Sequence, residues 1–162
     1  MTNLTWAPPP SALSPSNSKP IRLLWNGNLR DGARPAVAGA DIRRREIHLH
    51  PSLRDDAAER ARILTHEYFH FAWVRLGNPR RREWKRLLEV ELAGNARGEL
   101  GESSNWRKRD LPKHFANYAC ESFCDTAAWL FSNCAEHEEY TLANRWRQKR
   151  KAWFLANTPL RY

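Results

Sequence analysis

The sequence predicts an α+β fold in which a small N-terminal β-sheet precedes a bundle of helices. Two short strand-like segments come first, and after Pro51 the apolar residues recur with the helical period. Strands followed by helices, rather than alternating with them, are typical of the α+β class. The 162 residues suit a single domain. We expect this domain to cover residues 21–162, after a flexible arm at 1–20 that is rich in Pro and Ser.

Two segments carry the strand signals. Residues 21–25 are short and apolar, and the Asn-Gly-Asn sequence that follows them is typical of a hairpin turn. In residues 41–50, Ile47 and Leu49 alternate with polar neighbours, as in a strand with one buried face. The residues between the two segments are expected to form loops.

Four helices are predicted downstream, and they are separated by turn signals. Asp56 and Glu59 have the spacing of a capping box at the start of the first helix. Gly77-Asn78-Pro79 ends this helix, and residues 98–110 read as a polar loop. The expected helices cover residues 54–76, 81–96, 113–132 and 136–156.

The chain is strongly basic, with a formal net charge of +9. Such a charge favours acidic partners such as nucleic acid, anionic membrane surfaces or acidic proteins, although it also serves solubility alone. Basic clusters occur at 43–45, 80–82 and 145–151, the last interleaved with Trp146. These clusters are candidates for binding nucleic-acid phosphates, and a solvated helix face is the alternative for the last one.

Several features concern the cellular compartment. No run of 18 apolar residues occurs, so no transmembrane segment is expected. Residues 1–20 lack the basic and apolar blocks of a secretory signal. The odd number of cysteines, Cys120, Cys124 and Cys134, favours reduced thiols over a disulfide framework. We therefore expect a cytoplasmic protein in which Cys120 and Cys124 are small core residues, alternative metal ligands or a redox pair.

One short motif, His66-Glu67-Tyr68-Phe69-His70, carries metal chemistry. His66 and His70 are four residues apart in the first predicted helix, so their side chains project from one face. Two imidazoles in this arrangement can bind a tetrahedral Zn²⁺ ion, and Glu67 can take a proton from a metal-bound water. The alternative is a pair of core histidines bonded to carbonyl groups. The apolar residues around the motif predict a buried helix, in which polar side chains need partners. The spacing of the two histidines favours a metal ion as that partner over carbonyl groups.

A catalytic zinc site has a third protein ligand. His114 and His137 are the histidines further along the chain, and a carboxylate is the other choice. Glu121 and Asp125 lie one turn apart on the third predicted helix, which is otherwise mostly apolar. Buried carboxylates need a cation or another partner, although a solvated pair is the simpler alternative. Glu121 as a ligand, with Asp125 accepting from a ligand imidazole, fits the way in which zinc sites orient their histidines.

The two motifs together, His66-Glu67-x-x-His70 and Glu121-x-x-x-Asp125, resemble those of the gluzincin metallopeptidases. The resemblance covers roughly residues 41–130, and the whole chain is much shorter than thermolysin, a member of that family. It implies a minimal zincin-like fold whose active-site helices lie in the helical bundle. It also implies that His66, His70 and Glu121 bind zinc, that Glu67 is the general base and that Asp125 holds His66.

The resemblance has two further implications. The strand at 41–50 would be the edge strand beside the cleft, where an extended substrate adds as a further strand. Larger gluzincins also use a Tyr or His to stabilise the oxyanion, and no motif identifies that residue here. The candidates are Tyr118, His114, His137 and Tyr140. Residues 71–79 contain no His, so the metzincin extension is absent.

The expected function is that of a zinc-dependent metallopeptidase with one Zn²⁺ per chain. It would hydrolyse a peptide or protein substrate, an acidic one included, by means of a zinc-bound water and Glu67 as the general base. The alternative is a basic nucleic-acid-binding protein with a structural or degenerate zinc site, closed by Cys124 or His114. A protease recruited to DNA, as in the SprT-like zincins, is disfavoured because those proteins use a third His where Glu121 is expected.

Overall fold

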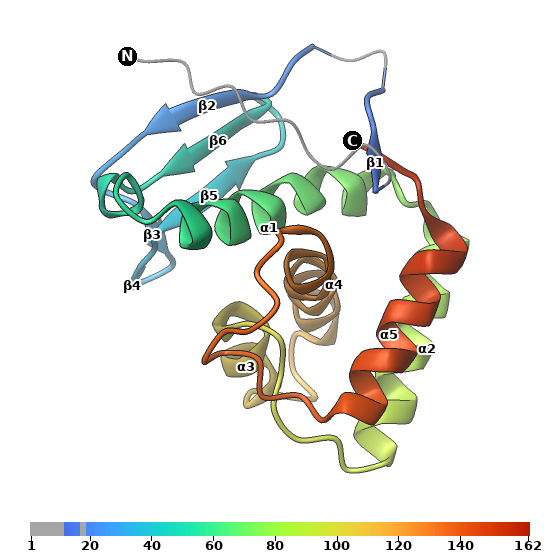
Figure 1. Cartoon of the computed structure of the whole chain (residues 1–162). Coiled ribbons are helices and arrows are strands. Elements are labelled where there is room, and N and C mark those ends of the chain that lie inside the picture. Colours follow the sequence, from blue (N-terminus) through green and yellow to red (C-terminus); the bar gives the residue numbers. More distant parts are fainter. Residues whose placement is uncertain (1–11, 17–18) are drawn as a thin grey trace.

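The computed structural model describes residues 12–16 and 19–162. It confirms the α+β class, with short strands followed by helices (Figure 1). The strands are β1 (Leu13–Ser14), β2 (Arg22–Trp25), β3 (Arg30–Asp31), β4 (Arg34–Pro35), β5 (Ala38–Asp41), β6 (Glu46–Leu49) and β7 (Leu160–Arg161). The helices are α1 (Ala57–Arg75), α2 (Asn78–Ala93), α3 (Glu102–Lys108), α4 (Phe115–Phe131) and α5 (Asn144–Asn157), with the 3₁₀ turn η1 (Pro51–Leu53) before α1. Among the described residues, none of these helices is long and apolar enough to cross a membrane.

Helix α1 is the central element of the fold. It packs against α4 on one side and against β5 and β6 on the other (Figure 1). Helices α2 and α5 lie side by side and cover α4. The core therefore forms around α1, where Phe69 stacks on Phe131 and touches Phe123 and Phe154. Such aromatic clusters contribute large apolar areas to the stability of a small domain.

The main sheet has the strand order β2-β6-β5. Strand β2 pairs in parallel with β6, so the Asn-Gly-Asn sequence after Trp25 is not a hairpin turn between neighbouring strands. The observed hairpins are β3–β4 and β5–β6. Residues 42–45 turn between β5 and β6, where Arg45 has a φ of 54° and the Asp41 side chain accepts a hydrogen bond from the Arg44 amide.

This topology corrects the expected edge strand. Within the predicted strand at 41–50, Asp41 is the last residue of β5, residues 42–45 form the turn, and Glu46–Leu49 form β6, the central strand of the sheet. The edge strand is β5, which lies in a segment predicted to be loop. Small residues such as Gly39 and Ala40 weakened the strand signal in β5, since strand propensity comes mainly from β-branched and aromatic side chains.

The boundaries of the first two helices follow their caps. The Asp56 side chain accepts a hydrogen bond from the Glu59 amide, as the capping spacing predicted. Helix α1 ends at Arg75, and α2 begins at once because Pro79 occupies the first helical turn. The second helix therefore covers 78–93 instead of the expected 81–96.

Two helical predictions were wrong. The polar stretch at 98–110 contains α3, whose buried side is hard to see in a segment of seven mostly polar residues. The last helix begins at Asn144 instead of residue 136. The chain before it is held as a loop, because the Thr141 amide bonds to the carbonyl of Glu99 and the Glu139 carboxylate pairs with Arg62.

The N-terminal segment is also corrected in part. Strand β1 pairs in parallel with β7, and both Ala12 and Leu13 are buried in the core. Residues 12–16 are therefore docked on the domain, because Leu13 supplies an apolar anchor among Pro and Ser residues. Residues 1–11 and 17–18, which belong to the expected flexible arm, lie outside the described residues.

A fully buried ion network joins α2, α4 and α5. The guanidinium of Arg150 contacts the carboxylates of Glu91 and Glu99, with shortest distances of 2.7 and 2.8 Å, and all three side chains are completely buried. Glu99 also accepts hydrogen bonds from Tyr118 and Lys108. Burial raises the pKa of Glu99, but Arg150 lowers it further, so that the pKa is below its usual value and this carboxylate stays ionised.

We expect the substitution Arg150→Met to destabilise the protein by about 3–5 kcal/mol, because it leaves the buried Glu91 without a cation and Glu99 with Lys108 alone. The free energy of unfolding, measured by urea denaturation at pH 7, checks this. Lys151→Met is the matched control, because Lys151 is the exposed neighbour on the same helix. A loss below about 1 kcal/mol for Arg150→Met would contradict the stabilising role of the network.

Candidate metal centre

A cleft of about 590 Å³ lies between the sheet edge and the helices. Its walls come from β5, α1, α3, α4 and the β3–β4 hairpin. The predicted site residues His66, Glu67, His70, Glu121 and Asp125 all line this cleft. The structure therefore brings the two sequence motifs together in one cavity of a size typical of ligand sites.

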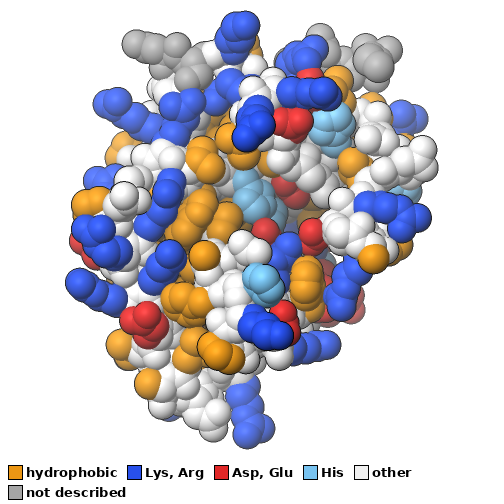
Figure 2. Space-filling model, turned by 180° about the vertical axis from the view of Figure 1, so that it is seen from behind, with side chains coloured by type: hydrophobic (Ala, Val, Ile, Leu, Met, Phe, Trp, Pro, Cys, Tyr) orange, Lys and Arg blue, Asp and Glu red, His pale blue; other side chains and the backbone are white. Residues whose placement is uncertain are grey.

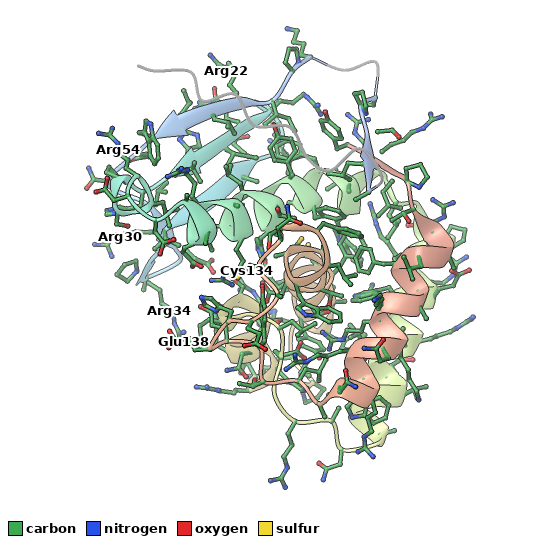
Figure 3. All side chains as sticks on the ribbon, viewed as in Figure 1. Arg22, Arg30, Arg34, Arg54, Cys134 and Glu138 are labelled. Atoms are coloured by element: carbon green, nitrogen blue, oxygen red, sulfur yellow. The ribbon has the colours of Figure 1, made fainter. Side chains whose placement is uncertain are left out.

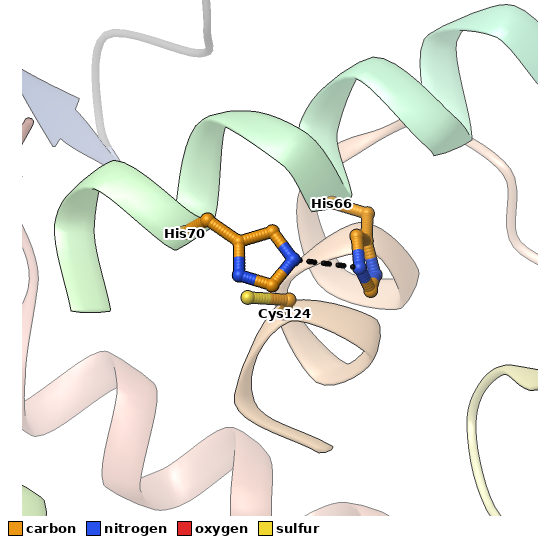
Figure 4. Close-up of side chains that lie close together, drawn as sticks. All are labelled: His66, His70 and Cys124. Carbon is orange, nitrogen blue, oxygen red and sulfur yellow. Dashed lines mark hydrogen bonds between the residues drawn. The ribbon is translucent and has the colours of Figure 1, made fainter. Parts of the chain in front are cut away.

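The two histidines face each other within the cleft. His66 and His70 lie on successive turns of α1, and their Nε2 atoms are 3.2 Å apart (Figure 4). The Nδ1 atom of each ring faces a different partner, Asp125 for His66 and Cys120 for His70. If each Nδ1 carries the proton, both Nε2 lone pairs point at the same space, which then needs a cation.

Glu121 of α4 completes a set of three ligand atoms. Its Oε2 atom lies 3.2 Å from Nε2 of His66 and 3.8 Å from Nε2 of His70. Tetrahedral ligands at ~2.0–2.1 Å from a zinc ion are about 3.3–3.4 Å apart, which these separations bracket. Burial opposes ionisation of Glu121, but its contacts with the two histidines and with Arg107 lower its pKa to about 2. The three side chains therefore fit a Zn²⁺ ion.

Asp125 orients His66. Its Oδ1 atom lies 2.7 Å from Nδ1 of His66, and its Oδ2 atom accepts hydrogen bonds from the backbone amide and the hydroxyl of Ser104. This fixes the Nδ1–H tautomer of His66, with Nε2 free for a metal. Gly101 makes the arrangement sterically feasible, because a Cβ atom at that position would lie 2.2 Å from Cγ of Asp125.

Cys124 is a competing third ligand. Its thiol sulfur lies within 4.8 Å of ligand atoms of both His66 and His70 (Figure 4). Burial raises the pKa of Cys124 well above its usual value, and its hydrogen bond to Cys120 raises it further. Because a zinc-binding cysteine must be a thiolate, the ionised Glu121 carboxylate is the better ligand.

Glu67 is buried beside the two ligands and lines the same cleft. Burial raises its pKa, although the neighbouring histidines oppose the shift. A carboxylate with a raised pKa is suited to accept a proton and later release it near neutral pH. The place and environment of Glu67 are thus those required of a general base.

None of the four candidates for oxyanion stabilisation is among the described residues that line the cleft. The Tyr118 hydroxyl donates to the buried Glu99, and Tyr140 packs in a separate apolar cluster with Leu100 and Leu142. His114 is the residue directly before α4, and its side chain is exposed. His137 lies in the loop before α5, where Nε2 is 3.3 Å from Glu59.

The structure instead places Arg107 in the cleft, a residue that the sequence analysis missed. Its Nη2 atom lies 2.7 Å from Asp31 and 3.7 Å from Oε1 of Glu121. It reaches the site from α3, the helix that was read as a loop. The β3–β4 hairpin, which carries Asp31 and the labelled Arg30 and Arg34, is linked to α3 by this ion pair (Figure 3).

The basic clusters are only partly available to a partner. Arg150 is buried in ion pairs, and Arg147 donates to the carbonyls of Leu142 and Tyr140. On the face shown in Figure 2, Lys and Arg side chains are scattered among other residue types rather than gathered in one patch. Two of the basic residues in 145–151, Arg147 and Arg150, therefore stabilise the fold through contacts within the protein.

Comparison with protein-family models, with curated proteins and with solved structures finds no match to this chain.

We expect zinc binding to release protons from the two histidines. Burial lowers the pKa of His70, but its contacts with Cys120 and Glu121 raise it to about 9 in the metal-free protein, and the pKa of His66 is also raised. Each imidazole must be neutral to bind a metal. Zinc affinity should therefore increase about tenfold per pH unit for each proton released, between pH 6 and 9.

Calorimetric titration with zinc at pH 7.5, in two buffers of different ionisation enthalpy, measures the protons released. The same raised pKa stabilises the metal-free fold below the unfolded-state pKa of about 6.5, and this stability is lost as the pH rises through about 9. Zinc affinity that does not depend on pH would contradict the assignment of both histidines as ligands.

Proposed function

We propose that the protein is a zinc-dependent metallopeptidase of the gluzincin type, with a zincin-like arrangement of its active-site helices. The observation that carries this proposal is the convergence of His66 Nε2, His70 Nε2 and Glu121 Oε2, which lie 3.2–3.8 Å from one another. Three protein ligands in an open cleft leave the fourth position to water or substrate, which distinguishes a catalytic site from a closed structural one.

The reaction follows from the charges around this centre. A bound zinc ion would supply Lewis-acid polarisation of the scissile carbonyl and a lower pKa for the attacking water. Glu67 accepts the proton of that water and passes it to the leaving amine. Asp125 keeps His66 in its metal-binding tautomer throughout, and the raised pKa of Glu67 suits both halves of this proton transfer.

We propose Arg107 as the group that balances charge beside the ligand carboxylate. Its contacts with Glu121 and Asp31 hold the guanidinium at the cleft wall. The guanidinium attracts Oε1 of Glu121 across 3.7 Å, and a partner on one oxygen of a ligand carboxylate influences which oxygen faces the metal. Arg107 thereby favours the orientation in which Oε2 of Glu121 faces the two histidines.

Strand β5 is the surface on which we propose that the substrate binds. It pairs with β6 on one side and lines the cleft with Ala38, Gly39 and Ala40. An extended peptide can add to such an edge through main-chain hydrogen bonds, which requires no particular side-chain sequence. The scissile bond would then lie over the metal centre on α1, which packs against β5.

The charge of the cleft differs from that of the whole chain. Four arginines line it, Arg30, Arg34, Arg62 and Arg107. Seven carboxylates also line it, namely Asp31, Glu59, Glu67, Glu102, Glu121, Asp125 and Glu139. A zinc ion would offset two of these negative charges. We therefore propose a neutral or basic peptide as the substrate, in place of the acidic one that the net charge of +9 suggests.

We expect Glu67→Gln to abolish peptide hydrolysis while zinc binding persists. The amide cannot take up a proton, and the loss of a general base lowers the rate by about 10²–10⁴-fold. Cleavage of a mixed peptide library by the zinc-loaded protein, followed by mass spectrometry, checks the activity, and elemental analysis checks the metal content. Glu138→Gln is the matched control, because Glu138 is exposed and does not line the cleft (Figure 3).

A Glu67→Gln protein that holds zinc and cleaves at the full rate would contradict the proposed mechanism.

A further inference from the structure

The two histidines of the metal centre have unlike partners at Nδ1. His66 faces the Asp125 carboxylate at 2.7 Å, whereas His70 faces the sulfur of Cys120 at 3.5 Å. Both partners belong to α4, and both contacts join this helix to α1. The sulfur contact is within the range of a hydrogen bond to sulfur, in which the imidazole N–H donates.

The ring of His70 needs such a partner. His70 is the less buried of the two histidines, and its side chain is 20% exposed against 8% for His66. An imidazole without a partner at Nδ1 can change its tautomer or rotate, and either change turns the Nε2 lone pair away from the metal. Ligand histidines are therefore held through their second nitrogen.

Cys120 is in turn held in place by its own surroundings. It is half-buried on α4, directly before the ligand Glu121, and it exchanges a hydrogen bond with Cys124 one turn further on. Cys124 is completely buried in the core. The sulfur of Cys120 thus has a fixed location, with one side on the core and the other on the ring of His70.

We propose that Cys120 is a positioning residue that holds the ring of His70 with Nε2 facing the metal. Cys120 accepts the Nδ1 hydrogen bond of His70, as Asp125 accepts that of His66. The inference rests on the proposed function, because it assumes that His66, His70 and Glu121 bind zinc. It assigns to Cys120 a role in the metal centre that differs from those of a ligand, a redox partner or a core side chain.

The chain offers a matched set of variants for the test. Cys120→Ala removes the acceptor, and Cys120→Ser restores one of similar size. Cys134→Ala is the control, because Cys134 is also a half-buried free cysteine but lies in the loop after α4 (Figure 3). The dissociation constant of Zn²⁺ for each full-length protein is measured by competition with a chelator of known affinity.

We expect Cys120→Ala to weaken zinc binding about 10–100-fold, with Cys120→Ser close to the unsubstituted protein and Cys134→Ala unchanged. The Nδ1–H resonance of His70 in the zinc-loaded protein gives a second readout, because it reports the hydrogen bond directly. The resonance should persist in Cys120→Ser and shift or vanish by exchange in Cys120→Ala. The melting temperatures of the metal-free proteins separate this effect from a loss of packing.

Two results would overturn the inference and leave the proposed function intact. One is zinc affinity and a His70 resonance in Cys120→Ala equal to those of the unsubstituted protein. The other is equal weakening in Cys120→Ala and Cys120→Ser together with lower melting temperatures, which would assign Cys120 to core packing. If the unsubstituted protein binds no zinc, the inference and the proposed function both fail.

Discussion

The geometry of the candidate metal centre depends on the buried carboxylate of Asp125. One oxygen holds His66 and the other accepts two hydrogen bonds from Ser104, so a single side chain fixes a ligand and attaches α3 to α4. The Ser104 hydroxyl also lies 3.3 Å from Glu99, which binds the buried Arg150. A continuous polar network therefore runs from the candidate metal centre to the core. Such networks are stable only when every member is paired, which ties the geometry of the site to the fold.

Charge is distributed unevenly in this molecule. The chain as a whole carries +9, yet the cleft is lined by more carboxylates than arginines. Part of the excess positive charge is internal, because Arg150 and Arg62 are buried among carboxylates. The net charge therefore says little about the substrate, since ligand recognition depends on the field within the cleft. The burial of Arg150 also weakens the alternative of a nucleic-acid-binding protein, because Arg150 belongs to one of the basic clusters on which that alternative is based.

The residues of the candidate metal centre could be found from the sequence because their spacing is set by helix geometry. Four residues make one turn, so the relations between His66 and His70, and between Glu121 and Asp125, are local. The neighbours in space could not be predicted in this way. Arg107 and Ser104 come from a seven-residue polar helix without an apolar period, and Cys120 differs from an ordinary core cysteine only in what it touches across the α1–α4 interface. The edge strand was missed because its small residues lack strand propensity, and its role comes from pairing with β6.

X-ray absorption spectroscopy of the zinc-loaded protein tests the central claim most directly, because it reports the atoms bound to the metal. The arrangement of His66, His70 and Glu121 predicts nitrogen and oxygen ligands alone, at about 2.0–2.1 Å, with the multiple scattering of two imidazoles. A sulfur ligand at about 2.3 Å would contradict it. Cys124 would then replace Glu121 as the third ligand, and the gluzincin assignment would be lost.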